Sequence, residues 1–568
     1  MNKFFKLKKL ILQTFILYTL LTGSSVSLEK YYKGNAVSNY FSGIISLQDK
    51  NYIESYNFLK NLENLEDHHF KYSMLYIETL VNNSKINEAF KYAKNLKKKD
   101  INFFQSDLVI ISKLIKNNDF NKLDKYLALI KDDKYSPLQG LLSQIIFSWT
   151  QVEKSKLNYN EAQEIFQLIN PRFKNIKKIN NIFLNCYFDT LNVEEKFQNL
   201  INDKNTDFSR YTFFYVNYLM KKNLPEKANL ILTAKLKEVP RNLLLNQLHT
   251  DIKLKKQNYL QNSFDCKNIS NIIAELFYIT SNALSTQNLY SLSNFYVNLS
   301  NYLNQNFFSY NMLLAENFTK IEDYQKAKKI YLLLKKFGEN YSWHSSKQIV
   351  SLSTEKAETE KAIKTLEKNY QNLNSPNVYQ TYDFAQFLKN DEKFEQSIKY
   401  YSDVLKNIPQ THELYPKAKD GRGIAYEQIG DWKKAEKDFL DSLKVKPNQA
   451  YVINYLAYSW IEKGINIEKS LKMLEEANRL RSNDGYITDS LGWALYKLKR
   501  YNKAKEYLKK AVQLMPSDPI VNDHFGDILW MNGDKLQARY YWKYVLNLEN
   551  AEDDLKDEIM KKILNGPA

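Results

Sequence analysis

The chain has 568 residues, and its 81 Lys and Arg outnumber its 64 Asp and Glu, which gives a net charge of +17. The lysines are mixed with acidic residues along the whole chain, which favours solvated helix faces over a nucleic-acid-binding patch. The chain holds only 14 Gly and 11 Pro, and no linker rich in Pro, Gly or Ser divides it. This composition argues against a string of separate globular domains.

Residues 1–27 have the pattern of a secretory signal peptide. Lysines precede residues 10–21, an apolar run that is too short to span a bilayer, which takes about 20 residues. Small residues follow, and we expect cleavage after Ser25 or Ser27 and export to the periplasm; an uncleaved anchor helix is the alternative. Residues 21–24 are similar to a bacterial lipoprotein signal, but Ser24 stands where the lipid-bearing Cys belongs. Without that thiol we expect no lipid anchor.

Residues 28–242 are predicted to form degenerate helix–turn–helix repeats. Apolar residues at helical spacing recur in slots that start at residues 36, 70 and 104, and slots near residues 138 and 209 continue the register. Residues 243–307 are helical in pattern but lose the register. We therefore expect a break between two halves of the array within residues 243–307.

Cys186 and Cys266 are the two cysteines of the chain and lie 80 residues apart, in different predicted repeats. The repeats of a solenoid contact their neighbours, so residues this far apart seldom meet. We therefore expect two buried free thiols, with one disulfide as the alternative in an exported chain. Neither cysteine belongs to a spacing that is typical of a metal site.

Residues 308–550 hold the clearest repeats, and the best of these occupy residues 416–550. One ladder of small residues advances in steps of 34, 35 and 34 and consists of Gly423, Ala457, Gly492 and Gly526. A second ladder follows 12 or 13 residues behind and consists of Ala435, Ser470, Ala504 and Ala538. Small residues on both helices of a pair allow the two helices to pack closely. Residues 551–568 have the apolar spacing of a capping helix, which a solenoid needs at its open end.

The register resembles that of tetratricopeptide repeats (TPRs), closely so over residues 416–550. The resemblance implies an all-α TPR solenoid, a superhelix of about fifteen stacked helix pairs. Residues 454–460, 483–493 and 518–527 also resemble long TPR proteins of the bacterial cell envelope, and residues 40–43 and 273–278 are similar to alphaproteobacterial members. Such proteins are typically non-catalytic scaffolds, and some adapt periplasmic C-terminal processing proteases to their substrates. The resemblance thus implies an exported adaptor whose partner is a periplasmic protease or envelope assembly machinery.

In TPR proteins the first helix of each pair lines a concave groove with its second, fifth, ninth and twelfth residues. The resemblance assigns to this protein-binding groove Tyr451, Asn454, Tyr458, Tyr486, Asp489, Trp493, Tyr496, Asp523, Asp527 and Trp530. The aromatic rings provide contact area, and the carboxylates favour a basic or amide-rich ligand. The Lys and Arg clamp with which some chaperone-binding TPRs hold a C-terminal carboxylate is missing. The alternative is that Trp493, Tyr496 and Trp530 pack between neighbouring repeats.

The sequence lacks HExxH, GxSxG, GxxxxGK[ST] and GxGxxG, the motifs of common catalytic and nucleotide sites. His524 with Asp523 and Asp527 has the residue types of a metal site, but on a solvent-facing helix such a group is more often a polar contact surface. We expect no enzyme activity, no cofactor and no nucleic-acid partner. The alternative function is binding or assembly of cell wall or polysaccharide, with peripheral attachment to the envelope through Lys and aromatic side chains.

Overall fold

The computed structural model describes residues 34–49, 51–62, 65–130, 136–255, 262–353 and 356–567. Within these ranges the chain forms 30 α-helices and three short 3₁₀ helices, and most helices pack in pairs along the chain. The predicted all-α fold of paired helices is confirmed. The predicted signal peptide lies outside the described residues. The chain divides into two compact units, residues 1–373 and residues 374–568.

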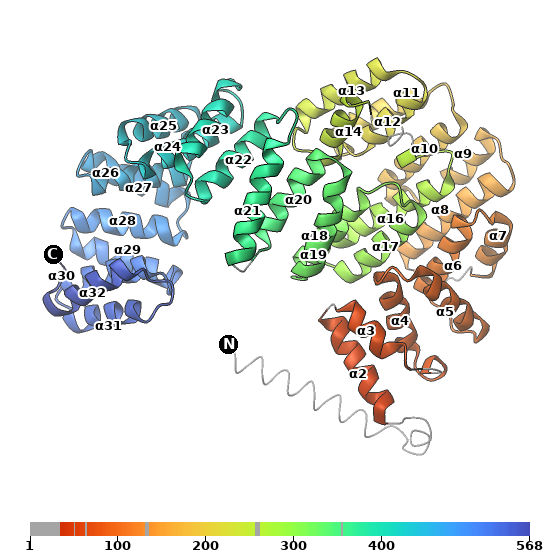
Figure 1. Cartoon of the computed structure of the whole chain (residues 1–568), viewed down its shortest axis with the longest axis horizontal. Helices are drawn as coiled ribbons and strands as arrows, with labels where there is room; N and C mark the ends of the chain where they lie inside the picture. The colour runs from red at the N-terminus through yellow and green to blue at the C-terminus, as the bar shows by residue number, and fades with distance from the viewer. Residues whose placement is uncertain are drawn as a thin grey trace. The chain divides into compact units, whose positions relative to one another are not determined.

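The second unit is a regular series of helix pairs followed by one last helix (Figure 1). Its helices are α22 (Val378–Asn390), α23 (Phe394–Lys406), α24 (Leu414–Gln428), α25 (Trp432–Val445), α26 (Ala450–Glu462), α27 (Ile467–Leu480), α28 (Gly485–Lys497), α29 (Tyr501–Leu514), α30 (Pro519–Met531), α31 (Lys535–Leu546) and α32 (Asp553–Asn565). We call the first helix of each pair helix A and the second helix B. Each helix B packs against its own helix A and against the helix A that follows.

Glycines on helix A let the two helices of a pair approach closely in this unit. A Cβ atom on Gly492 would lie 2.6 Å from Cγ of Leu508, and one on Gly423 would lie 2.7 Å from Cε1 of Phe439. At Gly526 a Cβ atom would meet Nε1 of Trp542. Real Cβ atoms do not approach other atoms so closely, so the predicted reason for the small-residue ladder is confirmed.

The turn from helix A to helix B also repeats. Gly430, Gly464 and Gly533 occupy this turn with φ of +81°, +68° and +90°, a left-handed conformation that glycine adopts without steric cost. The equivalent residue between α28 and α29 is Lys499, with φ of +58°. Glu392 occupies the turn between α22 and α23 with φ of +58°. A side chain in this conformation costs about 1–2 kcal/mol, so two turns of the series are strained.

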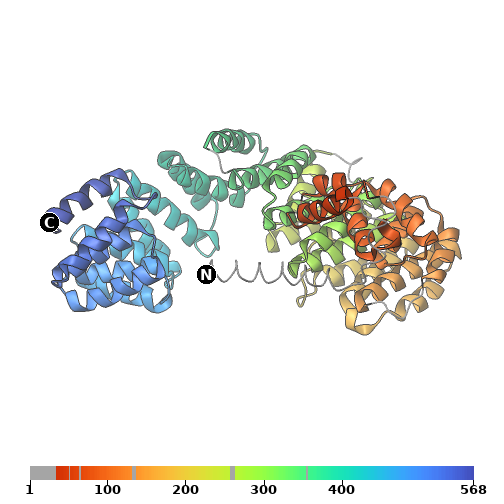
Figure 2. The ribbon, with the colours of Figure 1, turned by 90° about the horizontal axis from the view of Figure 1, so that it is seen from below.

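The first unit contains helix pairs of less regular length (Figures 1 and 2). Its α-helices are α2 (Gly34–Gln48), α3 (Tyr52–Leu59), α4 (Phe70–Asn82), α5 (Ile86–Lys98), α6 (Phe104–Lys116), α7 (Phe120–Leu129), α8 (Pro137–Lys154), α9 (Tyr159–Gln167), α10 (Lys174–Phe188), α11 (Val193–Ile201), α12 (Tyr211–Lys221), α13 (Pro225–Glu238), α14 (Leu243–Lys253), α16 (Ile269–Thr286), α17 (Tyr290–Leu303), α18 (Tyr310–Lys320), α19 (Tyr324–Leu334), α20 (Glu339–Ser351) and α21 (Lys356–Gln371). Short 3₁₀ helices lie at Leu65–Asp67, Pro171–Phe173 and Lys335–Phe337.

Helices α16 and α17 pack against α4, α6 and α8, far back in the sequence, so the first unit closes on itself. The hydroxyl groups of Tyr52 and Ser291 lie 3.1 Å apart. Nδ2 of Asn298 donates to Oδ1 of Asn82 over 3.3 Å, and Nζ of Lys116 donates to the carbonyl oxygen of Leu303 over 3.0 Å. The expectation that repeats contact only their neighbours is therefore wrong for this unit.

Because the first unit closes on itself, the two cysteines lie close together, contrary to our expectation. Cys186 at the end of α10 and Cys266 before α16 form a disulfide, and their Cα atoms lie 5.9 Å apart. The prediction of two free thiols is wrong because it assumed that distant repeats do not meet. Residues 243–307, where we expected a break, lie inside the first unit, and the structure divides the chain between residues 373 and 374 instead.

Candidate functional site

The helices A of the last three pairs, α26, α28 and α30, pack side by side, and we call the surface that they share the helix-A face. The ten residues that the sequence assigned to a groove all lie on these three helices. Tyr451 and Tyr486 are 52% and 60% exposed. The half-buried members are Asn454, Tyr458, Trp493, Tyr496 and Trp530. The carboxylates of Asp489, Asp523 and Asp527 are buried.

The two exposed tyrosines occupy equivalent places on successive repeats. The hydroxyl group of Tyr451 donates to Oδ2 of Asp484 over 2.8 Å, and the Arg481 guanidinium lies 4.8 Å from the centre of its ring. These contacts restrain Tyr451 while its ring stays accessible. An exposed aromatic ring with a polar tip offers contact area at a small loss of side-chain entropy.

Trp493 connects three successive repeats. Its ring stacks on Tyr496 with centroids 4.7 Å apart and on His524 of the next repeat with centroids 3.9 Å apart. Its Nε1 donates to Oε1 of Glu462 in the preceding repeat over 2.7 Å. The structure thus places Trp493 between repeats, as one of the two interpretations predicted, and leaves part of the ring exposed. Whether the exposed part also binds a ligand stays a prediction.

Asp489 forms an ion pair with the next repeat, because Nδ1 of His524 lies 2.9 Å from its Oδ2. Burial lowers the pKa of His524, but Asp489, together with Asp523 and Asp527, more than offsets burial and the net pKa lies above the ordinary value. His524 is only 7% exposed, so the expectation that it lies on a solvent-facing surface is wrong. The physical reason is that helix A buries this position against the preceding helix A.

Lys562 of α32 forms ion pairs with the other two carboxylates. Its Nζ lies 2.7 Å from Oδ2 of Asp523 and 3.0 Å from Oδ2 of Asp527. Burial raises the pKa of Asp527 to about 6, and the neighbouring Asp523 carboxylate adds to the effect while Lys562 opposes it. Burial lowers the pKa of Lys562, but the two carboxylates outweigh burial and hold its pKa above the ordinary range.

In the part of the chain that the structure describes, no group of three His, Cys, Asp or Glu is arranged to hold a metal ion.

Comparison with known proteins agrees with the arrangement of the chain in helix pairs. Residues 297–551 match the family model described as Tetratricopeptide repeat. This stretch is a tetratricopeptide-repeat region. The TPR repeat-containing protein PA4667 of Pseudomonas aeruginosa is 27% identical over 143 residues, which are 25% of this chain and 23% of that protein. The match therefore spans about a quarter of the relative's length.

Two solved structures are also similar to parts of the chain. MamA 41-end from Desulfovibrio magneticus RS-1 is 21% identical, with coverage of 31% of this chain and 97% of that structure and a TM-score of 0.27. TTC0263, a thermophilic TPR protein of Thermus thermophilus, is 16% identical, with coverage of 33% and 100% and a TM-score of 0.29.

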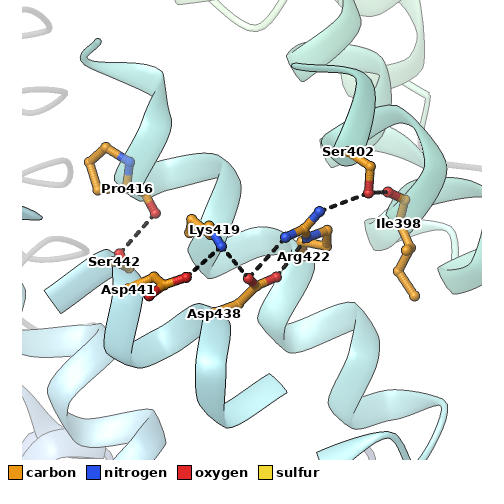
Figure 3. A network of polar contacts seen from close by, with 8 residues as sticks. All are labelled: Ile398, Ser402, Pro416, Lys419, Arg422, Asp438, Asp441 and Ser442. Atoms are coloured by element: carbon orange, nitrogen blue, oxygen red, sulfur yellow. Dashed lines mark hydrogen bonds and ion pairs between the residues drawn. The ribbon is translucent and has the colours of Figure 1, made fainter. Parts of the chain in front are cut away.

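One TPR holds a buried charge network that the sequence reasoning missed (Figure 3). Nε and Nη2 of Arg422 donate to the two oxygens of Asp438 over 2.6 and 2.9 Å. Nζ of Lys419 donates to Asp438 and to Asp441, over 2.7 Å in each case. Arg422 directly precedes Gly423 of the small-residue ladder, and the equivalent residues in the later units are Leu456, Leu491 and Phe525. A charged residue at a position that is otherwise apolar was the signal in the sequence that could have predicted this network.

A second buried ion pair lies in the first unit. Nε and Nη2 of Arg210 donate to the two oxygens of Glu275 over 2.7 and 2.9 Å, and Nη1 donates to Oγ of Ser309 over 3.0 Å. The Arg210 guanidinium also lies 3.8 Å from the centre of the Tyr278 ring. Because the carboxylate and the guanidinium satisfy each other, this pair fastens the start of α12 to α16 and to α18.

Proposed function

We propose that the protein is a non-catalytic scaffold that binds other proteins through the helix-A face. The observation that carries this proposal is the pair of exposed rings, Tyr451 and Tyr486, at equivalent places on successive TPRs. Half-buried Tyr458, Trp493 and Tyr496 extend the same surface. Rigid aromatic side chains dominate the energetics of protein recognition, and a TPR region typically serves as a protein-binding scaffold.

We also propose that the scaffold acts in the periplasm of a bacterium. The Cys186–Cys266 disulfide supports this location, because disulfides persist mainly in oxidising compartments. The signal-like residues 1–27 support it as well. The resemblance to alphaproteobacterial envelope proteins adds a finer proposal, in which the scaffold presents substrates to a periplasmic protease. None of the helices in the described ranges is long and apolar enough to cross a membrane.

The test is affinity purification from crosslinked envelope extract with the wild type and a Tyr451→Ala/Tyr486→Ala double variant. These exposed side chains are better targets than Asp489 or Asp523, because each of these carboxylates belongs to a buried ion pair that holds the repeats together. The matched control is Tyr540→Ala on α31, because that ring is 69% exposed and lies on a helix B. We expect a discrete protein that the wild type and the control recover and the double variant does not.

Two other outcomes contradict the proposal in different ways. Equal recovery of a partner by all three proteins would show that the helix-A face is not the binding surface. Recovery of envelope glycan without protein would reject the scaffold and favour the cell-wall function. A recovered protease would in addition support the finer adaptor role.

A further inference from the structure

Counted from unit starts at residues 416, 450, 485 and 519, the fifth residue of the repeat is a hydrogen-bond acceptor on helix A in four successive repeats. These residues are Asp420, Asn454, Asp489 and Asp523, and we call them the acceptor ladder. Their steps are 34, 35 and 34 residues, and each lies three residues before a member of the small-residue ladder. Equal register places each member at the equivalent position of its helix A. In the preceding repeat the equivalent residue is Tyr382, so the ladder is confined to the last four pairs.

Three members of the ladder hold a buried oxygen that accepts nothing from the described part of the protein. These atoms are Oδ1 of Asn454, Oδ1 of Asp489 and Oδ1 of Asp523. The Asp489 and Asp523 residues are only 6% and 5% exposed. A buried acceptor that lacks a donor costs about 1–3 kcal/mol. The recurrence of this cost at one place in three successive repeats is not explained by packing, and it points to donors that come from outside the chain.

The protein itself shows which donors these carboxylates take. The second oxygen of Asp489 binds the His524 imidazole, and the second oxygen of Asp523 binds the Lys562 ammonium. Both are charged or chargeable N–H groups on neighbouring elements. Each pairing leaves the other oxygen of the carboxylate without a donor. Hydrogen bonds from a cationic N–H group to a carboxylate are about twice as strong as neutral ones, so a further cationic donor would gain most.

We propose that the acceptor ladder binds a peptide segment that carries Lys or Arg side chains, with one cationic side chain per repeat. The proposal rests on the protein-binding function proposed above and names its ligand class. Neighbouring helices A are about 8–10 Å apart. A peptide in the polyproline II conformation advances about 9 Å in three residues, which make one full turn, so every third side chain lies on the same face. The ligand therefore carries its basic residues at every third position. The half-buried ring of Tyr458 lies close enough to interact with the Asp489 carboxylate and favours a cation in the same place.

The net charge of +17 makes this proposal easy to distinguish from unspecific attraction. A chain with this charge repels basic peptides in general, so a preference for them has to come from a local site. At low ionic strength the repulsion is strongest, and a specific site still binds.

The test is selection of a displayed library of random 12-residue peptides on the full chain. We expect enriched peptides with Lys or Arg at every third position and at least tenfold weaker binding to Asp489→Asn. The matched control is Asp557→Asn, which removes the same charge from an exposed place on α32 and should bind like the wild type. Asn454→Leu provides a second variant that leaves the His524 pair intact, and we expect weaker binding there too. Circular dichroism establishes that each variant is folded.

The outcomes separate this proposal from the proposed function. Enriched peptides without basic residues, or peptides that bind Asp489→Asn and Asn454→Leu as well as the wild type, would reject the acceptor ladder and leave peptide binding in place. A selection that enriches nothing above a blank surface would reject both proposals for this surface.

Discussion

Lys562 is the single side chain that holds two buried carboxylates together at the end of the second unit. Its ammonium lies within 3.0 Å of both Asp523 and Asp527. Removal of one partner from a buried ion pair is more damaging than replacement of the whole pair, because the remaining charge has no compensation. The contribution of Lys562 should therefore depend on the protonation of its two partners.

We predict that Lys562→Met lowers the free energy of unfolding by about 3–5 kcal/mol at pH 8 and by less at pH 5. The pKa of Asp527 in the folded protein is about 6, above the ordinary 3.8, and loss of the ammonium raises it further. A raised folded-state pKa means that stability falls as the pH rises through that value. Urea unfolding at the two pH values, followed by tryptophan fluorescence, measures the difference.

Lys561→Met is the matched control, since Lys561 is exposed and adjacent on the same helix. Its effect should stay within about 0.5 kcal/mol at both pH values. An equal loss at pH 5 and pH 8 in Lys562→Met would show that packing of the lysine stem, and not charge, is responsible.

We predict that substitution of Gly by Ala has opposite effects on stability at two positions. Gly526→Ala introduces a methyl group where Trp542 is fully buried, and overpacking of this kind costs about 1–3 kcal/mol. Gly140→Ala introduces one in α8 with no atom within 4 Å, and should stabilise by about 0.5–1 kcal/mol. Differential scanning calorimetry of both variants measures the signs. A gain in both would mean that α30 and α31 separate at little cost.

The close packing of helix A on helix B could be predicted from the small-residue ladder, because a steric requirement that repeats every 34 or 35 residues selects small residues at that spacing. The sequence did not predict which carboxylates are paired. Asp523 and Asp527 owe their partner to α32, and no repeat fixes the register of that last helix. An Asp at this position of the repeat gives the same sequence pattern whether its carboxylate faces water or a cation.

At the scale of the helix pair, the turn between helix A and helix B limits stability in two repeats. Glu392 and Lys499 adopt the left-handed conformation that Gly430, Gly464 and Gly533 adopt in the other turns. We predict that Lys499→Gly raises the free energy of unfolding by up to about 1 kcal/mol, because relief of the strain exceeds the entropy that glycine loses on folding.

The reciprocal substitution Gly464→Lys is the control, and it should destabilise by about 1–2 kcal/mol. Urea unfolding of both variants tests the pair. If Gly464→Lys were neutral, backbone strain at this turn would not limit stability, and a gain in Lys499→Gly would need another cause.

The pairing of helices could be predicted in the second unit because each pair contacts mainly its sequence neighbours. In the first unit α16 and α17 have a helical pattern in the sequence, but the pattern does not specify their partners. Their contacts with α4, α6 and α8 come from closure over long sequence separations. Local periodicity carries no information on such contacts, which is why the break predicted in residues 243–307 has no counterpart there.

At the scale of the whole molecule, the Cys186–Cys266 disulfide closes a loop of 80 residues in the first unit. A native disulfide of this loop length typically contributes about 2–5 kcal/mol, largely through the unfolded chain. We predict that Cys186→Ser/Cys266→Ser lowers the melting temperature of residues 1–373 and leaves the transition of residues 374–568 unchanged.

Calorimetry of the wild type and the double variant, each with and without a reductant, checks this prediction. The reductant should shift the wild type toward the variant and have no effect on the variant itself. A shift of both transitions would mean that the two units unfold as one, against their division into separate compact bodies.

The closure of the first unit has a consequence for how the chain can change its length over evolutionary time. Duplication of one 34-residue unit in residues 416–550 adds a helix pair between two similar neighbours and preserves every interface. The same duplication between α4 and α16 would displace one side of the closed unit and break the disulfide and the Tyr52–Ser291 contact. Homologues should therefore vary in repeat number after residue 374 and keep a constant number before it.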